Sequence, residues 1–206
     1  PGINTDGIIG ALYTPDDGQT NPIDTTMALA KGARMNGVEI FENTAMEELI
    51  IKDNVVTGIR TDKGTMEVDQ VILCGGMWTR DLAKTVGVNL PIYTCEHQYI
   101  VTEEMEGLTP RPVLRDYDQG LYFKEDAGKM LVGWFKDNAI GRTMSKIDDE
   151  FCFCQFPLDQ DHVEPYVMSS MDVFPQLETT GIRTWFNGPE SFTNDNLHLL
   201  GPTSEV

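Results

Sequence analysis

The sequence predicts an α+β fold in which short antiparallel strands outnumber helices. Short apolar runs follow one another between residues 38 and 68, and two-residue turns between them are typical of an antiparallel meander. A second pair of runs, 120–124 and 129–135, has the form of a hairpin through residues 125–128. Helical signals are few by comparison, and they lie far apart in the chain.

The first part of the chain is expected to hold a strand, a turn-rich loop and a helix. Residues Ile8 to Tyr13 form the apolar run of a short strand. Asp24 or Thr25 can then cap a helix that continues to about Met35. The pair Asn36-Gly37 ends this helix, because glycine readily adopts the left-handed conformation past a helix end.

A meander of short strands follows the first helix. The expected strands are residues 38–41, 45–52, 55–61 and 65–68. Asp53-Asn54 and Lys63-Gly64 supply the turns between the last three, since Asn, Asp and Gly tolerate turn conformations.

The unit from Val71 to Val86 is the most informative local feature. Residues Val71–Cys74 form a continuous apolar run, which predicts a strand buried on both faces. Gly75-Gly76 follows, and then a helix that Gly87 ends. Two glycines allow a ligand close to the backbone, and a helix start presents free N–H groups. From spacing alone, an ordinary tight turn between strand and helix explains the same pattern.

The second half of the chain continues the α+β pattern. A strand is expected over residues 90–102, and a final strand over 182–187, with a loop over 188–195. Between them, one helix face is marked by the spacing of four apolar residues, namely Val163, Val167, Met171 and Phe174.

Composition excludes several function classes. The chain has 206 residues and a formal net charge of −18, and eight of its acids lie between residues 147 and 182. This charge disfavours a nucleic-acid or anionic membrane partner, which requires Lys and Arg. No apolar run approaches the roughly 20 residues of a membrane span. The opening lacks Met and a signal peptide, so we expect a cytoplasmic piece of a longer protein, and a targeting segment could lie outside this piece.

The common catalytic motifs are absent from the sequence. The three histidines are far apart, so we expect no metal site. Neither a P-loop, nor a G-x-S-x-G elbow, nor a G-x-G-x-x-G fingerprint is present. Cys152 and Cys154 are interpreted as buried apolar thiols on one face of an extended segment, and no cysteine receives a catalytic role.

Four stretches, taken in order, resemble the D-amino-acid-oxidase-type FAD-dependent oxidoreductases, closest to the dimethylglycine and sarcosine dehydrogenase branch. They are Gly10–Gly18 with Asn21-Pro22, Val71–Trp78, Glu96–Glu103, and Asn187–Asp195 with Leu200-Gly201-Pro202. They are similar to that branch's segments G…P-x-D-G…D-P, V-x-x-A-G-x-W, H-Q-Y-x-V-T-E and N-G-P-x-x-F-T-P-D…x-G-P. The chain departs from this pattern at Asn194, where Pro is usual, and at Cys74-Gly75, where Ala-Ala or Ala-Gly is usual.

The resemblance implies a large antiparallel or mixed sheet flanked by helices, together with an incomplete FAD-binding domain. Residues 1–90 would form part of the FAD domain with inserted strands. Residues 91–187 would form the substrate-binding domain, and residues 188–206 would return toward the FAD domain. The phosphate-binding G-x-G-x-x-G unit would then lie before Pro1, and the chain alone would be inactive.

The resemblance also assigns roles to individual residues. The catalytic candidates are His97 and Tyr99, on the strand that would face the substrate side of the flavin. The cofactor-binding candidates are Met46, Gly75, Gly76 and Trp78. Tyr122 and Trp134, on the hairpin, are candidate walls of an amine pocket, since aromatic faces attract an alkylated ammonium. For His97, Tyr122 and Trp134, ordinary packing in the sheet is the alternative.

The implied reaction is oxidation of a small N-methylated amino acid by hydride transfer to flavin. The alternatives are the same fold acting on glycine, proline or a glycerol phosphate, and a non-catalytic module that binds small amines or amino acids. Whether Arg115 or Arg142 binds a substrate carboxylate stays open at this point.

Overall fold

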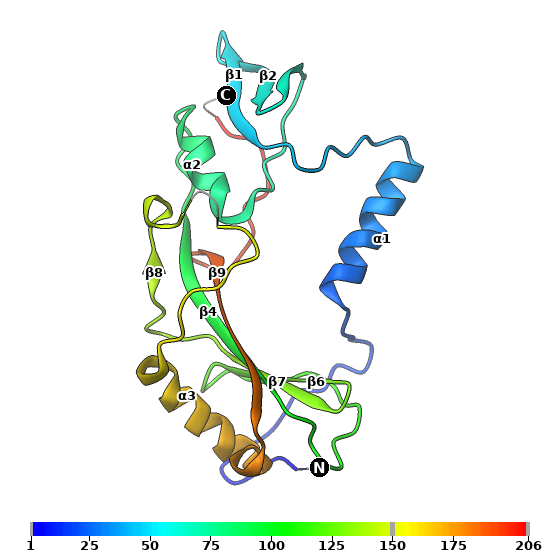
Figure 1. The fold of residues 1–206 in the computed structure, drawn as a ribbon, viewed down its shortest axis with the longest axis vertical. Coiled ribbons are helices and arrows are strands. Elements are labelled where there is room, and N and C mark those ends of the chain that lie inside the picture. The colour runs from blue at the N-terminus through cyan, green and yellow to red at the C-terminus, as the bar shows by residue number, and fades with distance from the viewer. Residues whose placement is uncertain (1, 149–150, 205–206) are drawn as a thin grey trace. The chain divides into compact units, whose positions relative to one another are not determined.

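The computed structural model describes residues 2–148 and 151–204, which fall into two compact units (Figure 1). Unit 1 takes in the described residues of Pro1–Thr20, Glu96–Ile140 and Cys152–Pro189. Unit 2 takes in those of Asn21–Cys95, Gly141–Phe151 and Glu190–Val206. The α+β class is confirmed, and no helix in the described ranges is long and apolar enough to cross a bilayer.

Unit 1 is built on the larger sheet. Its elements are β4 (Ile92–Thr102, entering from unit 2), β5 (Leu114–Asp116), β6 (Leu121–Asp126), β7 (Lys129–Trp134), α3 (Gln160–Val173), the 3-10 helix η3 (Pro175–Thr179) and β9 (Ile182–Thr193, leaving to unit 2). The sheet has the order β5-β6-β7-β4-β8, and β9 also pairs with β4. Strands β4, β5, β6 and β7 are antiparallel to their neighbours in this order, and the pairing of β6 with β7 is the predicted hairpin.

Side chains alternate between the two faces of this sheet. Along β4, the even-numbered residues from Thr94 to Thr102 are buried, and the odd-numbered residues from Cys95 to Val101 are half-buried. The buried face carries the core together with α3 and η3, so we call it the helix face and call the other the open face. The core residues are Ile100, Met105, Leu121, Phe123, Met130, Val132, Trp134, Val173, Phe174 and Leu177.

The α3 helix attaches to this core as its spacing predicts. Val163 is fully buried, and Val167 and Met171 pack against the core. Asp159 caps the helix by accepting a hydrogen bond from the backbone N–H of His162. The Phe174 ring, just past the helix end, lies 4.9 Å from the Phe123 ring.

Unit 2 contains the first helix and the meander. Its elements are α1 (Pro22–Met35), β1 (Met46–Lys52), β2 (Val55–Thr61), β3 (Gly64–Glu67), the 3-10 helix η1 (Gly76–Trp78), α2 (Thr79–Lys84), β8 (Gly141–Arg142) and the 3-10 helix η2 (Met144–Lys146). The α1 cap is Asn21, whose side chain accepts from the N–H groups of Ile23 and Asp24, so the predicted cap at Asp24 or Thr25 is wrong. Gly37 ends the helix with a φ of 84°, as expected.

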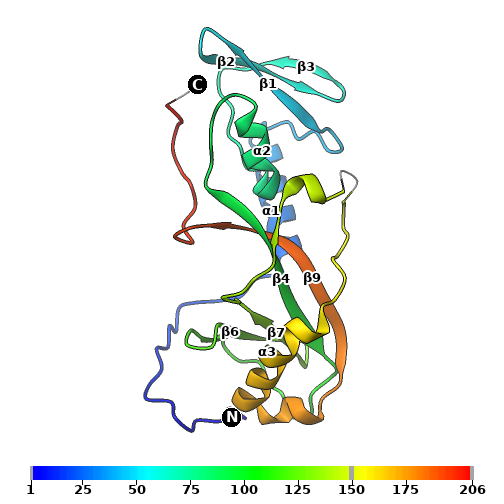
Figure 2. The same cartoon turned by 90° about the vertical axis from the view of Figure 1, so that its left-hand side faces the viewer.

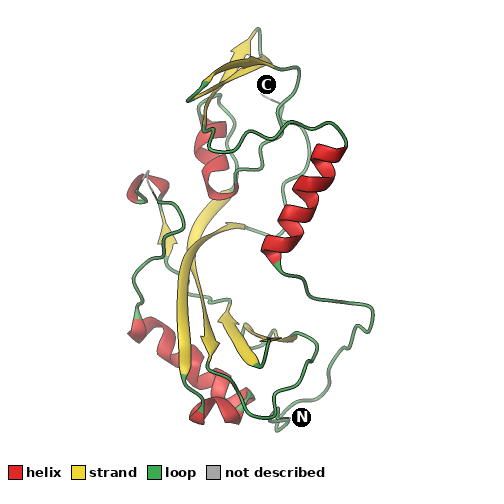
Figure 3. Cartoon of the chain, turned by 45° about the vertical axis from the view of Figure 1, so that its right-hand side comes forward, coloured by secondary structure: helices red, strands yellow, loops and turns green. Residues whose placement is uncertain are grey.

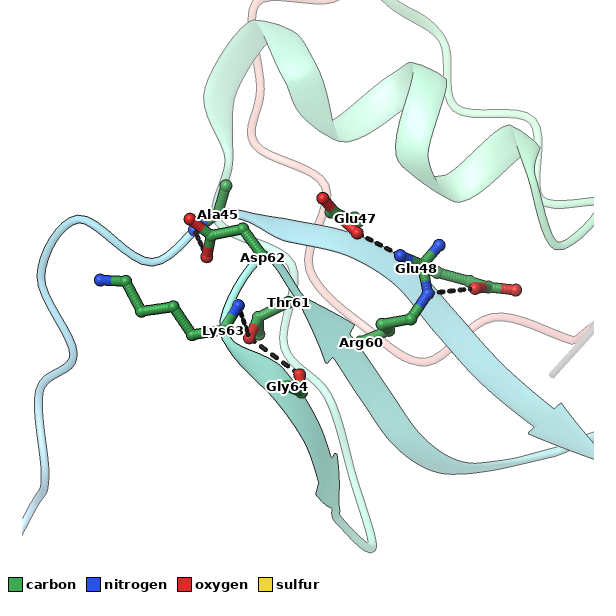
Figure 4. Close-up of polar contacts among 8 residues, drawn as sticks. All are labelled: Ala45, Glu47, Glu48, Arg60, Thr61, Asp62, Lys63 and Gly64. Atoms are coloured by element: carbon green, nitrogen blue, oxygen red, sulfur yellow. Dashed lines mark hydrogen bonds and ion pairs between the residues drawn. The ribbon is translucent and has the colours of Figure 1, made fainter.

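The meander of β1, β2 and β3 is antiparallel, as predicted (Figure 2). Asp53 and Asn54 both have positive φ, which matches the twist of a two-residue hairpin turn. Figure 4 shows Arg60 of β2 reaching two neighbouring carboxylates of β1, Glu47 and Glu48, the latter at 2.9 Å from Nε. These exposed ion pairs hold the register only weakly, because water screens them.

Three predicted strands are absent from the described structure, where loops take their place (Figure 3). Residues 8–13, 38–41 and 71–74 have no ladder pairing, and side chains such as Ile9 and Ile72 are exposed. An apolar run becomes a strand only where a neighbour accepts its backbone hydrogen bonds. None of the described strands pairs with these runs.

Two further expectations are corrected. Strand β9 continues to Thr193, through the predicted loop at 188–195. Cys152 and Cys154 are exposed, because Phe153 between them has a φ of 53° and breaks the extended conformation. The two units also divide the chain differently from the predicted domains. Residues 2–20 belong to unit 1, apart from the rest of the predicted FAD domain, and the described part of 141–151 belongs to unit 2, apart from the predicted substrate-binding domain. The roles of the domains stay a prediction.

Phe123→Ala should lower the free energy of unfolding by roughly 3–5 kcal/mol, because it leaves a cavity beside Phe174 in the core. Phe153→Ala is the matched control, since that ring is fully exposed, and it should change the same quantity by less than about 0.5 kcal/mol. Urea unfolding followed by tryptophan fluorescence measures both. Equal effects would contradict the assignment of the core.

Candidate functional site

One row of residues crosses the open face of unit 1 from β5 to β4. Arg115 pairs with Tyr122, Tyr122 with Gly133, and Gly133 with Tyr99. Because paired residues of neighbouring strands point to the same face, this register brings two predicted site residues, Tyr122 and Tyr99, onto one surface.

Gly133 provides the space for the Tyr122 ring. A Cβ atom at position 133 would lie 2.1 Å from Cζ of Tyr122, so the phenol lies directly over the glycine. The Tyr122 hydroxyl is 3.1 Å from Nε2 of His97, within hydrogen-bond distance. The direction of this bond depends on the imidazole tautomer. The structure therefore joins the predicted catalytic histidine to the predicted substrate-binding tyrosine.

Phe135 and Arg115 complete an open-face cluster around His97 and Tyr122. The Phe135 ring lies 4.8 Å from the His97 ring and 5.6 Å from the Tyr122 ring. The Arg115 guanidinium lies 5.3 Å from the centroid of Phe135 and 5.9 Å from that of Tyr122. Cation–π attraction of this kind orients the guanidinium and leaves its N–H groups available at the edges of the rings.

Tyr99 lies two residues after His97 on β4 and therefore on the same face. Its ring stacks on Phe186 of β9, with centroids 4.5 Å apart. Burial raises the pKa of the Tyr99 phenol, because the charged phenolate loses hydration there. Tyr99 therefore keeps its hydroxyl proton near neutral pH and can donate a hydrogen bond.

Trp134 lies on the other face of the sheet from His97, Tyr99 and Tyr122. It pairs with Leu121 and Gln98 in the register, so it points to the helix face. The side chain is 0% exposed, and its indole N–H donates to the Ser170 hydroxyl of α3 at 3.1 Å. This placement favours the packing alternative over a pocket wall.

The predicted cofactor residues all lie in unit 2. Met46 is the half-buried first residue of β1. Gly76 has a φ of +56°, and a Cβ there would approach no atom closer than 4.0 Å. Met77 is buried and anchors η1, whereas Trp78 is 56% exposed. An anchored, side-chain-free stretch of backbone fits a segment that a flavin dinucleotide could approach closely.

Sequence reasoning missed Phe135 altogether and left Arg115 undecided. The alternation of β7 contains the missing signal, because Phe135 lies two residues beyond Gly133 and so continues the face of Tyr122. Arg142, the other candidate for binding a carboxylate, lies on β8 of unit 2, where it pairs with Thr94.

The open-face cluster combines a fixed cation, two aromatic faces and a titratable imidazole. The guanidinium can bind a carboxylate through paired hydrogen bonds. Aromatic faces attract an alkylated ammonium. An imidazole takes up or releases a proton near neutral pH. Together these groups suit a small molecule that carries both an amine and a carboxylate.

Gly133→Ala should displace the Tyr122 ring and break its hydrogen bond to His97, because the added Cβ overlaps the phenol. The imidazole NMR signals of His97, which respond to the hydrogen-bond partner, measure this loss. Gly32→Ala in α1 is the control, since nothing lies within 4 Å of its added Cβ. Unchanged His97 signals in Gly133→Ala would contradict the described contact.

Comparisons with known proteins identify the family of the chain. The family model "FAD dependent oxidoreductase" matches residues 1–206. The chain is 40% identical to "4-methylaminobutanoate oxidase (formaldehyde-forming)" of Paenarthrobacter nicotinovorans, over 97% of this chain and 24% of that protein. It is 32% identical to human mitochondrial sarcosine dehydrogenase, over 100% of this chain and 23% of that protein.

The chain is also similar to a protein named as a regulatory subunit and to a solved structure. The chain is 32% identical to the mouse mitochondrial "Pyruvate dehydrogenase phosphatase regulatory subunit", over 100% of this chain and 24% of that protein. The solved structure of L-proline dehydrogenase from P. horikoshii matches with a TM-score of 0.79 at 22% identity, over 93% of this chain and 49% of that one, which shows the fold alone.

The chain thus spans about a quarter of the length of the curated relatives it matches. The family match extends over the whole chain, and the structural match shows that the chain shares its fold with that proline dehydrogenase. The chain belongs to the D-amino-acid-oxidase-type family of FAD-dependent oxidoreductases.

Proposed function

We propose that this chain is the substrate-binding part of an oxidoreductase that oxidises a small N-methylated amino acid, such as sarcosine or dimethylglycine. The observation that carries the proposal is the open-face cluster, in which Arg115, Tyr122 and His97 lie within one connected set of contacts. Two relatives whose names specify N-methylated amino acids support the choice of substrate.

The roles follow from the chemistry of each group. Arg115 binds the substrate carboxylate, and the faces of Tyr122 and Phe135 lie beside the methylated amine. His97 and Tyr99 are the candidate catalytic residues. His97 accepts the proton of the substrate ammonium, so that the amine is neutral when it reacts. Tyr99 orients the substrate by donating a hydrogen bond to it.

FAD supplies the hydride acceptor when it is bound. In this proposal Met46, Gly75, Gly76 and Trp78 of unit 2 would hold the cofactor, with the two glycines allowing it close to the backbone. The chain carries no G-x-G-x-x-G motif, so we expect turnover only where the rest of the family's cofactor domain is present.

A second candidate is a non-catalytic module that binds small amines or amino acids. A specific observation favours it, because one relative at 32% identity is named a regulatory subunit. The two candidates differ in one measurement. Anaerobic addition of sarcosine to the FAD-loaded full-length protein should bleach the visible flavin absorption. Binding of sarcosine without bleaching would favour the module and contradict the oxidoreductase.

Arg115→Met should raise the KM for sarcosine by about 10- to 100-fold, since a charge-assisted hydrogen bond contributes roughly 1.5–3 kcal/mol. Its kcat should change much less, because Arg115 binds the carboxylate and not the reacting amine. Steady-state kinetics measures both constants. Arg183→Met is the matched control, as that exposed arginine lies 3.9 Å from Glu103 on another part of unit 1. An unchanged KM in Arg115→Met would contradict the proposal that Arg115 binds the substrate carboxylate.

A further inference from the structure

A buried polar cluster lies on the helix face of the larger sheet, where β9 pairs with β4. Its members are Glu96 and Gln98 of β4 and Asn187 of β9, which are 4%, 0% and 2% exposed. A buried polar group costs free energy unless hydrogen bonds satisfy it. Nothing in the proposed reaction uses these three side chains.

Asn187 joins β9 to β4 and to the segment that precedes α3. Its side-chain amide donates to the Glu96 carboxylate at 2.7 Å and to the carbonyl of Pro157 at 3.0 Å. Its backbone N–H donates to Oε1 of Gln155 at 3.2 Å, and its backbone carbonyl accepts from the N–H of Phe156 at 2.8 Å. These hydrogen bonds fix the position of one residue of β9 from two sides.

The partners of the Asn187 amide determine its orientation. A backbone carbonyl and an ionised carboxylate can only accept hydrogen bonds, so an inverted amide would place Oδ1 against two acceptors. A second amide, that of Gln98, has its nitrogen 3.5 Å from the same oxygen of Glu96. The Glu96 carboxylate therefore selects a donor at position 187, which makes this contact between β4 and β9 specific.

The two residues before Asn187 contact the sheet on alternate faces. Trp185 packs against the core, where its ring lies 6.5 Å from that of Trp134. Phe186 stacks on Tyr99 of the open face, with ring centroids 4.5 Å apart and ring planes 18° apart. Because successive side chains of a strand point to opposite faces, one backbone places Asn187 toward the core and Phe186 over Tyr99.

The hydrogen bond of Asn187 specifies the register of β9. A slip of one residue would turn Asn187 to the open face and Phe186 to the core. The buried Glu96 carboxylate would then lose its donor at 2.7 Å. Loss of a donor from a buried charged acceptor is costly, so the slipped register is disfavoured and Phe186 stays on Tyr99.

The contact also joins two of the stretches that carry the family resemblance. Glu96 opens the stretch Glu96–Glu103, and Asn187 opens the stretch Asn187–Asp195. They are 91 positions apart in the chain, yet the structure places their side chains within one hydrogen bond. The resemblance gave neither residue a role, and their juxtaposition suggests one.

We propose that Asn187 is a positioning residue for Tyr99, because its hydrogen bond to Glu96 holds β9 in the register that stacks Phe186 on the phenol ring. The stacked ring restricts the directions in which the Tyr99 hydroxyl can point. This inference deepens the proposed function and rests on it for the kinetic readout, since orienting the substrate is the role that Tyr99 has there.

Asn187→Asp, made in the FAD-loaded full-length protein, removes the donor and places a second carboxylate against Glu96. The kcat for sarcosine should fall about 10- to 100-fold because the substrate is no longer oriented, whereas KM should change less than about threefold because Arg115 still binds its carboxylate. Asn138→Asp is the matched control. Its exposed side chain accepts from the Tyr166 hydroxyl at 2.7 Å, and a carboxylate accepts equally well, so both constants should stay within about twofold.

The double variant Glu96→Gln with Asn187→Asp separates the hydrogen bond from other effects of the substitution. It rebuilds the contact with donor and acceptor exchanged, because the new amide can donate to the new carboxylate. Its kcat should exceed that of Asn187→Asp by at least about threefold, which independent substitutions would not give. Recovery should be partial, since the Pro157 carbonyl still loses its donor.

A second readout requires no turnover. A fluorotyrosine at position 99 gives a fluorine NMR signal that responds to the ring current of Phe186. This signal should move in Asn187→Asp and in Phe186→Leu, and it should return toward the wild-type position in the double variant. If the wild type and all variants fail to oxidise sarcosine, the proposed function fails, and the fluorine signal still decides the role of Asn187.

An unchanged kcat and an unmoved fluorine signal in Asn187→Asp would overturn the inference, as would a double variant that recovers neither. A lower melting temperature with an unmoved fluorine signal would assign Asn187 to stability alone and would also contradict the positioning role. Should Asn187→Asp not fold, Asn187→Ala takes its place with the same expected kcat and fluorine signal, because it removes the donor without adding a charge.

Discussion

A two-residue turn at Ala127 and Gly128 joins β6 to β7, and both its residues have positive φ. This turn fixes the register of the hairpin, in which Asp126 pairs with Lys129 and Tyr122 therefore pairs with Gly133. A slip of one residue would send every side chain of a strand to the opposite face. Both the core beneath the sheet and the cluster above it depend on this single register.

The two faces of the larger sheet carry different kinds of side chains. On the helix face, burial of apolar side chains against α3 stabilises the unit, and Glu96 is admitted only with donors around it. On the open face, Arg115 and His97 keep polar atoms available beside aromatic rings. Because both sets of residues alternate along β4, one strand backbone orients side chains of the core and of the open-face cluster.

Much of the fold could be predicted because its signals are local. Two-residue turns and alternating apolar residues determine β1, β2, β3 and the β6–β7 hairpin, and the spacing of Val163 to Phe174 determines α3. The predictions failed where a strand depends on a distant partner. Residues 71–74 are apolar enough to form a strand but have no described neighbour, whereas β9 extends through Pro189 because β4 pairs with it.

The sequence by itself determined the family, the strand that carries His97 and Tyr99, and the aromatic character of the candidate site, because these are encoded in short contiguous motifs. Only the tertiary structure decided that Arg115 and Phe135 join the open-face cluster and that Trp134 belongs to the core. Those assignments depend on pairing between strands that are far apart in the chain. The spacing of residues along one strand contains no information about its partner's register.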